Sequence, residues 1–157
     1  MTGNTHVIGG LVAGLATAQF TDMEPVLLIG TGVIGALIPD ICHGGSWIGK
    51  RLPILSRIIH VIFGHRSFTH SLLFLLIIGA LLHTFITHEA VIYGLIAGMA
   101  SHLLLDMGTK NGIKLFFPIS IRVRLPLTIR TGSKGEDIVF AALSLLTVYF
   151  GYEVFII

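Results

Sequence analysis

The residues with the clearest chemical potential lie in two short segments, each at the end of a long apolar run. Residues 65–71 read His-Arg-Ser-Phe-Thr-His-Ser, and residues 102–106 read His-Leu-Leu-Leu-Asp. His6 and the pair Asp40 and His43 occupy similar places on two other apolar runs. Ionisable side chains are costly inside a bilayer, so in apolar segments they indicate functional sites. Since imidazole and carboxylate groups are common metal ligands, metal binding is the first function that these residues suggest.

The spacing within each set predicts ligands that share one metal ion. His102 and Asp106 are four residues apart and would lie on one face of a helix. His65 and His70 are five apart, so one of them is expected in the loop before the helix. Mixed imidazole and carboxylate ligands favour zinc, with manganese or iron as alternatives, whereas carboxylates alone would favour magnesium or calcium. The predicted metal ligands are His6, Asp40, His65, His70, His102 and Asp106.

Two further residues are candidates for a catalytic role at such a site. Three or four protein ligands with an open coordination position are typical of catalytic metal sites, where a bound metal can lower the pKa of water to about 7. Arg66 could hold a phosphate or carboxylate oxygen through its planar guanidinium group. Glu136 is expected at the start of a helix, either as a capping residue or as a general base or extra ligand. The candidate catalytic residues are Arg66 and Glu136.

The composition places these residues in a membrane. Of 157 residues, 54% are hydrophobic and only 11% are charged, whereas a soluble domain carries about 25% charged residues. The single Cys42 excludes an internal disulfide bond. We therefore predict an all-α transmembrane bundle of about five membrane helices in one membrane domain, residues 1–157. Glycines near helical spacing should let these helices pack closely. The expected helices cover residues 6–20, 25–42, 68–87, 90–106 and 138–157.

The basic residues predict how the bundle is oriented. All ten Lys and Arg residues fall in residues 43–67 and 107–136, and the other two connections carry none. By the positive-inside rule both segments are cytoplasmic, so the N-terminus lies in the cytoplasm and the C-terminus lies outside the inner membrane. A cleaved signal peptide is the alternative interpretation of the first run. The absence of Lys and Arg at its start and its many glycines argue against cleavage.

Each basic segment contains a stretch with a pattern of its own. Residues 53–63 place isoleucines on one helical face, which suits a short helix in the headgroup layer. Residues 119–130 partly alternate apolar and basic residues, with Pro126 as a break, which indicates a small cytoplasmic β-hairpin. Alternatively, both stretches are simply basic surface beside anionic lipid.

This topology places every candidate set at the cytoplasmic ends of the helices. Asp40 and Asp106 fall at helix C-termini, where the helix dipole disfavours a negative charge, so a compensating cation is expected. His83 follows His70 by 13 residues, which is about 20 Å along a helix. His83 and His88 should therefore lie near the outer face and take no part in the site.

Several of these pieces resemble the YdjM-type family of bacterial inner-membrane proteins, described as metal-dependent hydrolases. The most specific piece is residues 65–71, and together the pieces run over most of the chain. The resemblance implies a metal-dependent hydrolase. One departure is that Cys42 stands where the family pattern Pro-Asp-x-Asp-His has a second Asp, so Cys42 is a softer ligand or supports a ligand. The other pieces are Thr5-His6 with Gly9 and Gly10, residues 39–43, residues 102–106 with Thr109 and Gly112, and residues 131–133 with Glu136.

These observations favour a membrane-bound hydrolase that cleaves an ester or phosphoester of a membrane lipid with metal-activated water at the cytoplasmic face. The expected partner is a membrane lipid, because the candidate residues lie at a membrane face beside basic loops. The sequence shows no nucleic-acid motif and no evidence of an obligate protein partner. A metal-binding transporter or sensor is the main alternative, although transport sites usually lie near the bilayer midplane. Haem binding between histidine pairs would not need the two aspartates. A scaffold without chemistry is the remaining alternative.

Overall fold

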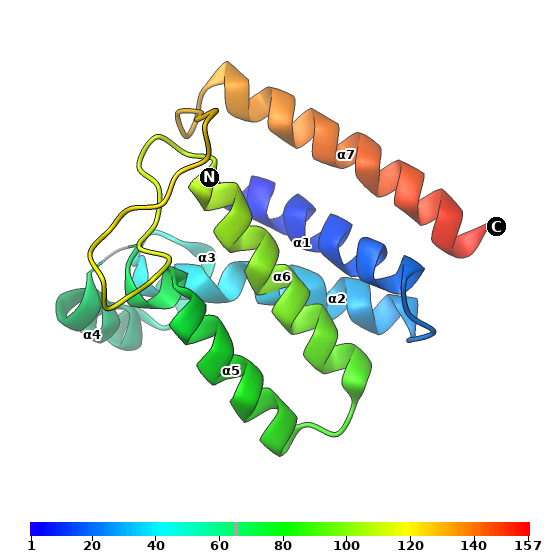
Figure 1. Cartoon of the computed structure of the whole chain (residues 1–157), viewed down its shortest axis with the longest axis horizontal. Helices are drawn as coiled ribbons and strands as arrows, with labels where there is room; N and C mark the ends of the chain where they lie inside the picture. Colours follow the sequence, from blue (N-terminus) through cyan, green and yellow to red (C-terminus); the bar gives the residue numbers. More distant parts are fainter. Residues whose placement is uncertain (65) are drawn as a thin grey trace.

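The computed structural model describes residues 1–64 and 66–157, and these residues confirm the all-α class (Figure 1). His65, a predicted metal ligand, lies outside the described residues. The described part of the chain forms seven α helices and two short 3-10 helices, η1 and η2. In chain order they are α1 (Gly3–Gln19), α2 (Pro25–Leu37), η1 (Ile38–Cys42), α3 (Trp47–Arg51), α4 (Pro53–Phe63), η2 (Phe68–His70), α5 (Leu72–Phe85), α6 (Glu89–Met107) and α7 (Lys134–Phe155).

Each predicted apolar run forms a helix, but two runs are interrupted near the candidate residues. The second run changes from α2 to η1 after Leu37. Pro39 has no backbone N–H and cannot continue the α-helical ladder, so it favours this change. The third run starts as an α-helix only at Leu72, because η2 precedes it and the hydroxyl of Ser71 accepts a hydrogen bond from the backbone N–H of Phe74 at 3.2 Å. Both interruptions place polar side chains on short turns at one end of the bundle.

Three helices are long and apolar enough to cross a membrane: α2 continued through η1, then α6, then α7. By contrast, α1 has 17 residues and α5 has 14, and a full crossing takes about 20. The expected total of five membrane helices is therefore not confirmed, and the assignment of inside and outside stays a prediction.

The core of the bundle is formed by α1, α2 and α6, which pack with their backbones close together. A Cβ atom on Gly10 of α1 would lie 2.5 Å from the carbonyl oxygen of Gly32 of α2. A Cβ on Gly98 of α6 would also collide with the Gly32 carbonyl, and one on Gly35 would collide with the carbonyl of Leu95. Since van der Waals packing drives helix association in lipid, these contacts hold the three helices together. The predicted packing role is confirmed for Gly10, Gly32, Gly35 and Gly98, whereas a Cβ on Gly30 would meet nothing within 4 Å.

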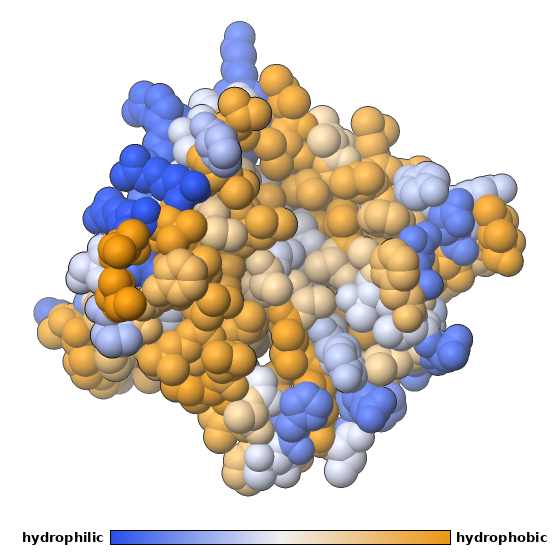
Figure 2. Space-filling view, viewed as in Figure 1, coloured by the Kyte–Doolittle hydropathy of each residue, from blue (hydrophilic) through white to orange (hydrophobic). Residues whose placement is uncertain are grey.

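The helices α5 and α7 lie at the periphery. No residue of α5 is buried, and Glu136 is the only buried residue of α7. In Figure 1, α7 runs beside α1, whereas α5 diverges from α6. Apolar side chains cover much of the face shown in Figure 2, and hydrophilic ones gather at opposite margins. This pattern fits helices whose outer sides face lipid.

The predicted helix in residues 53–63 is present as α4, and the short α3 precedes it. The apolar side chains of Ile54, Ile58 and Ile62 are exposed, whereas Ser56 is buried against the rest of the molecule. An amphipathic helix with an exposed apolar face beside basic residues suits the boundary between lipid and water.

The expected β-hairpin in residues 119–130 is not found, and the described residues contain no β strand. Val123 and Ile129 instead pair singly with Ile113 and Thr109 in two isolated bridges. The stretch therefore pairs with the loop that follows α6 rather than with itself. Pro126 within the stretch lacks a backbone donor, which limits a continuous ladder.

The two basic segments, the N-terminus and the start of α7 lie at one end of the bundle in Figure 1. The connections between α1 and α2 and between α5 and α6 lie at the other end, as does the C-terminus. The fold therefore gathers the ends of α2 and α6 and the beginnings of α1 and α5 in one region.

Candidate metal centre

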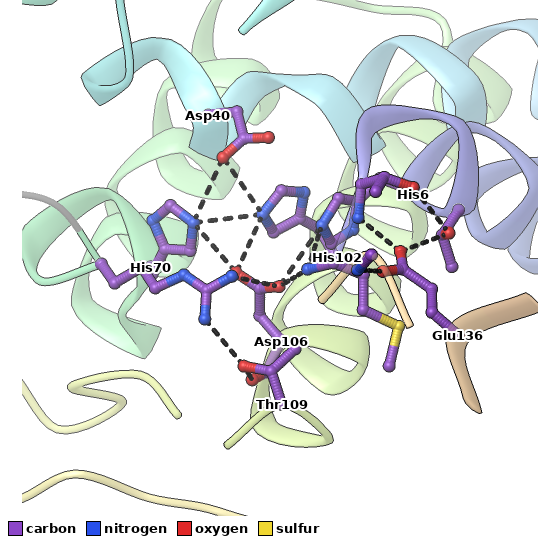
Figure 3. A network of polar contacts seen from close by, with 12 residues as sticks. His6, Asp40, His70, His102, Asp106, Thr109 and Glu136 are labelled. Carbon is purple, nitrogen blue, oxygen red and sulfur yellow. Dashed lines mark hydrogen bonds and ion pairs between the residues drawn. The ribbon is translucent and has the colours of Figure 1, made fainter. Parts of the chain in front are cut away.

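Five of the six predicted ligands converge between these helix ends (Figure 3). They come from four separate elements: α1, η1, η2 and α6. The side chains of His6, His70, His102 and Asp106 are at most 1% exposed, whereas that of Asp40 is 17% exposed. This buried polar cluster, formed by His6, Asp40, His70, His102 and Asp106, is called the His/Asp cluster below.

His102 lies in the middle of the His/Asp cluster, and its hydrogen bonds fix its tautomer. Its Nδ1 atom lies 2.6 Å from the carbonyl oxygen of Ala36. A carbonyl can only accept, so Nδ1 carries the hydrogen and the neutral ring presents a lone pair at Nε2. That Nε2 atom lies 3.1 Å from Nε2 of His70 and 3.8 Å from Oδ2 of Asp106. Donation of the other ring nitrogen to a backbone carbonyl is the usual arrangement of a metal-binding histidine.

His70 faces both carboxylates of the cluster. Its Nε2 atom lies 3.6 Å from Oδ1 of Asp40 and 3.5 Å from Oδ2 of Asp106. The turn η2 points the ring inward, and the hydroxyl of Thr69 lies 3.1 Å from Nδ1. Two carboxylates within reach of one imidazole nitrogen create a strongly negative position that favours a cation.

His6 completes the other side of the cluster. Its ring stacks on that of His102, with ring centroids 3.6 Å apart, and its Nε2 atom lies 3.4 Å from Oδ1 of Asp106. The amino group of Met1 contacts both His6 and Asp106. The Nδ1 atom of His6 is buried and has no hydrogen-bond partner among the described residues.

The donor set fits a divalent metal ion. Two overlapping groups have ligand atoms that all lie within 4.8 Å of one another: His6, Asp40 and His102, and His70, His102 and Asp106. The outward lone pair of His102 and the two carboxylates converge as acceptors, an arrangement that favours a cation between them. Three imidazoles with two carboxylates match zinc, manganese or iron chemistry, and the geometry does not choose among these metals.

Arg66 lies at the edge of the His/Asp cluster. It donates hydrogen bonds to the hydroxyl of Thr109 at 2.7 Å and to Oδ1 of Asp106 at 3.1 Å. Its φ of +59° is uncommon outside glycine and is maintained by these contacts and by a hydrogen bond from the backbone N–H of Lys114 to the Arg66 carbonyl. Thr109, which the sequence offered only as part of the family resemblance, is a partner of Arg66 that was not predicted as a site residue.

Glu136 is not part of either potential ligand group. One of its carboxylate oxygens accepts hydrogen bonds from the backbone N–H of Thr2 at 2.5 Å and from the hydroxyl of Thr5 at 2.7 Å. The other accepts from the backbone N–H of Gly132 at 2.7 Å. Both oxygens are therefore occupied, and the geometry favours a positioning role for Glu136, which ties the start of α1 to the start of α7 (Figure 3).

The remaining histidines lie outside the His/Asp cluster. His83 and His88 are exposed near the connection between α5 and α6, at the opposite end of the bundle. His43 is exposed just after η1, and the Nδ1 atom of His60 lies 3.2 Å from the carbonyl oxygen of Cys42. Cys42 itself is buried beside the cluster and interacts with His70.

A cavity of about 540 Å³ gives access to the His/Asp cluster. Asp40 and Arg66 contribute polar side chains to its wall, and Trp47 and Ile48 of α3 contribute apolar ones. An opening with both polar and apolar walls is typical of ligand-binding sites. The cavity can therefore accept a molecule with an anionic group and an apolar portion.

The comparisons with known proteins agree on one family. The family model of the YdjM inner membrane protein matches residues 1–157. The chain is 52% identical over 155 residues to the uncharacterized protein YvsG of Bacillus subtilis (strain 168). That alignment covers 99% of this chain and 97% of YvsG. The chain is also 33% identical over 166 residues to the inner membrane protein YdjM of Escherichia coli (strain K12). That alignment covers 95% of this chain and 82% of the Escherichia coli protein.

No solved structure matches the chain. The whole-chain family match and the three long apolar helices together support an inner-membrane location. The chain therefore belongs to the YdjM inner membrane protein family.

Proposed function

We propose that this protein is a membrane-bound metal-dependent hydrolase that cleaves an ester or phosphoester bond of a membrane lipid. The observation that carries the proposal is the arrangement of the His/Asp cluster, where ligand atoms from four elements lie close together beside an accessible cavity. A closed structural metal site would have no need of such an opening.

The chemistry follows from the residues in the cluster. A divalent metal held by His70, His102 and Asp106, with His6 and Asp40 in reach, would supply a Lewis acid and lower the pKa of water. In the hydrolysis, the water oxygen forms a bond to the phosphorus or acyl carbon, the ester bond breaks, and the leaving alkoxide takes up a proton. The carboxylate of Asp40 reaches the cavity, so its oxygen that does not bind the metal is well placed to accept the proton of the attacking water and to pass it to the leaving alkoxide.

Arg66 would stabilise the negative charge that develops on the substrate. Its guanidinium contacts Asp106 with one nitrogen and Thr109 with another, and it also lines the cavity. A guanidinium group carries five N–H donors, so further donors remain for a substrate oxygen. Donors that are already fixed in place stabilise developing charge at little reorganisation cost.

The position of the His/Asp cluster favours hydrolysis over transport. His102 and Asp106 belong to the last two turns of α6, and His6 lies in the first turns of α1. The cluster is therefore at one end of the helices, whereas transport sites usually lie near the middle of the membrane. Metal uptake into sealed vesicles that contain the purified protein would instead support a transporter.

Metal analysis of the detergent-purified protein tests the first part of the proposal. Mass spectrometry should find near-stoichiometric zinc, manganese or iron in the wild type. Asp40→Ala, His70→Ala and Asp106→Ala should lose the metal, whereas His83→Ala should retain it because His83 lies at the opposite end.

Turnover of lipids tests the second part. The metal-loaded wild type should hydrolyse at least one lipid in a panel of phosphoesters and carboxylic esters, and the three metal-deficient variants should not. A wild type that binds metal stoichiometrically but hydrolyses none of the panel would reject the hydrolase and leave a metal-binding protein.

A further inference from the structure

A second cavity, of about 280 Å³, is lined by cationic side chains. It shares Arg66 and Asn111 with the larger cavity, so the two are neighbours beside the His/Asp cluster. The described residues that line it are Arg66, Asn111, Gly112, Lys114 and Arg122, and none of these is acidic.

Backbone hydrogen bonds hold the cationic residues around this cavity. The N–H of Lys114 donates to the carbonyl of Arg66 at 3.2 Å. Next to Lys114, Ile113 exchanges two hydrogen bonds with Val123, at 3.2 and 2.8 Å, which brings the adjacent Arg122 to the same wall. Arg66 and the loop that follows α6, which are far apart in the sequence, therefore both contribute positive charge to this cavity.

Gly112 allows the turn that closes this wall. Its φ is +60°, and a Cβ atom there would lie 2.6 Å from the carbonyl oxygen of Val123. The position therefore needs a residue without a side chain. The absence of a side chain also leaves room for the side chain of Arg124, whose Cγ would lie 2.6 Å from a Cβ at this position.

The charges around the cavity are only partly balanced by the protein. Arg66 pairs with Asp106, but Lys114 and Arg122 form no ion pair with any described residue. The side-chain amide of Asn111 likewise has no hydrogen-bond partner in residues 1–64 and 66–157. Two uncompensated cations match the charge of a phosphomonoester, which is about −1.5 to −2 at pH 7.

We propose that this cavity is a phosphate-binding cradle that holds a phosphomonoester group beside the metal centre. The cradle comprises Arg66, Asn111, Lys114 and Arg122. As an extension of the proposed function, it makes the substrate a phosphorylated lipid, whose apolar part would lie along Trp47 and Ile48. The same chemistry would accept free inorganic phosphate, and the experiment below separates the two sources.

The test measures binding to the full-length protein, as purified in a non-ionic detergent, by isothermal titration calorimetry. One arm uses inorganic phosphate. The other compares a short-chain phosphatidate with the matching phosphatidylcholine, which lacks a phosphomonoester. Lys114→Gln and Arg122→Gln should each weaken binding by about tenfold or more, because each removes a charge-assisted hydrogen bond.

Arg57→Gln is the matched control, because it removes the same charge from an exposed position on α4 that is not among the residues lining the cavity. It should change the affinity less than twofold. If the protein binds both inorganic phosphate and phosphatidate, the phosphate group alone is sufficient for binding. If it binds phosphatidate but not inorganic phosphate, the ligand is the lipid headgroup. Equal losses in Arg122→Gln and Arg57→Gln would indicate diffuse attraction and overturn the cradle, as would a wild type that binds neither ligand.

Hydrolysis of a phosphorylated lipid separates the cradle from the proposed function. Arg122→Gln should retain its metal and show a raised KM. Phosphate binding without any hydrolysis would reject the hydrolase and leave the cradle. Hydrolysis with an unchanged KM in Arg122→Gln would reject the cradle and leave the hydrolase.

Discussion

Asp106→Asn is the most informative substitution at the His/Asp cluster. The carboxylate of Asp106 lies within 3.4 to 3.8 Å of one nitrogen of each of three imidazoles, and it also pairs with Arg66. Asparagine has nearly the same shape, so the packing around the buried side chain should persist. The substitution mainly removes one negative charge and one anionic ligand.

The expected loss of metal affinity can be estimated from the ligand set. Four-ligand structural zinc sites contribute about 10–16 kcal/mol of apparent binding free energy, which corresponds to about 2.5–4 kcal/mol for each ligand. A loss of about 2.5–4 kcal/mol weakens binding by about 10²- to 10³-fold. Asp106 approaches all three imidazoles of the cluster, so we expect its loss to cost the whole binding free energy of one ligand.

Competition with a fluorescent zinc chelator would measure this change on detergent-purified protein. Asp137→Asn is the matched control, because Asp137 is an exposed carboxylate at the start of α7 and belongs to neither potential ligand group. Its zinc affinity should remain within threefold of the wild type. If Asp106→Asn also stays within threefold, Asp106 is not a metal ligand and the proposed centre is wrong.

Three other substitutions test how the site is held in place. Gly98→Ala should lower the stability of the bundle by about 1–3 kcal/mol because its methyl group would collide with the Gly32 carbonyl, and thermal unfolding in detergent would measure this. Glu136→Gln should lower the melting temperature by several degrees while zinc binding persists, because charge-assisted hydrogen bonds worth about 1.5–3 kcal/mol each are weakened. Arg66→Lys should retain the metal but reduce lipid turnover about tenfold to a hundredfold, because a single ammonium cannot reproduce both contacts of the guanidinium.

Each of these predictions has a result that would contradict it. Gly30→Ala is the control for Gly98→Ala, since a Cβ on Gly30 meets nothing within 4 Å; equal destabilisation of the two variants would reject the packing argument. Loss of metal from Glu136→Gln at unchanged stability would make Glu136 a ligand. Full activity of Arg66→Lys would show that positive charge alone is needed.

Much of the helical organisation could be predicted because it depends on local composition. Apolar runs of sufficient length form helices in lipid, where every backbone polar group needs an internal partner. The positions of α2 and α6 therefore matched the expectation closely. The β-hairpin in residues 119–130 did not form, since these residues pair with the loop after α6, and alternation within a short segment carries no information about such a distant partner.

The site was predictable to a similar extent. Ligand residue types at the ends of apolar runs, together with the distribution of basic residues, were enough to expect His6, Asp40, His70, His102 and Asp106 at one face. These residues lie close together because consecutive helices run in opposite directions. The end of one helix and the beginning of the next therefore lie on the same side of the bundle.

The sequence by itself determined that this protein is membrane-embedded, that it is helical, and which imidazoles and carboxylates could bind a metal. Only the tertiary structure assigned Glu136 its positioning role between α1 and α7. Its carboxylate oxygens accept hydrogen bonds from Thr2, Thr5 and Gly132. It also brought Lys114 and Arg122 to one cavity. The physical reason is that residue type and spacing set local conformation, whereas contacts between distant segments depend on how the helices pack and where the loops return.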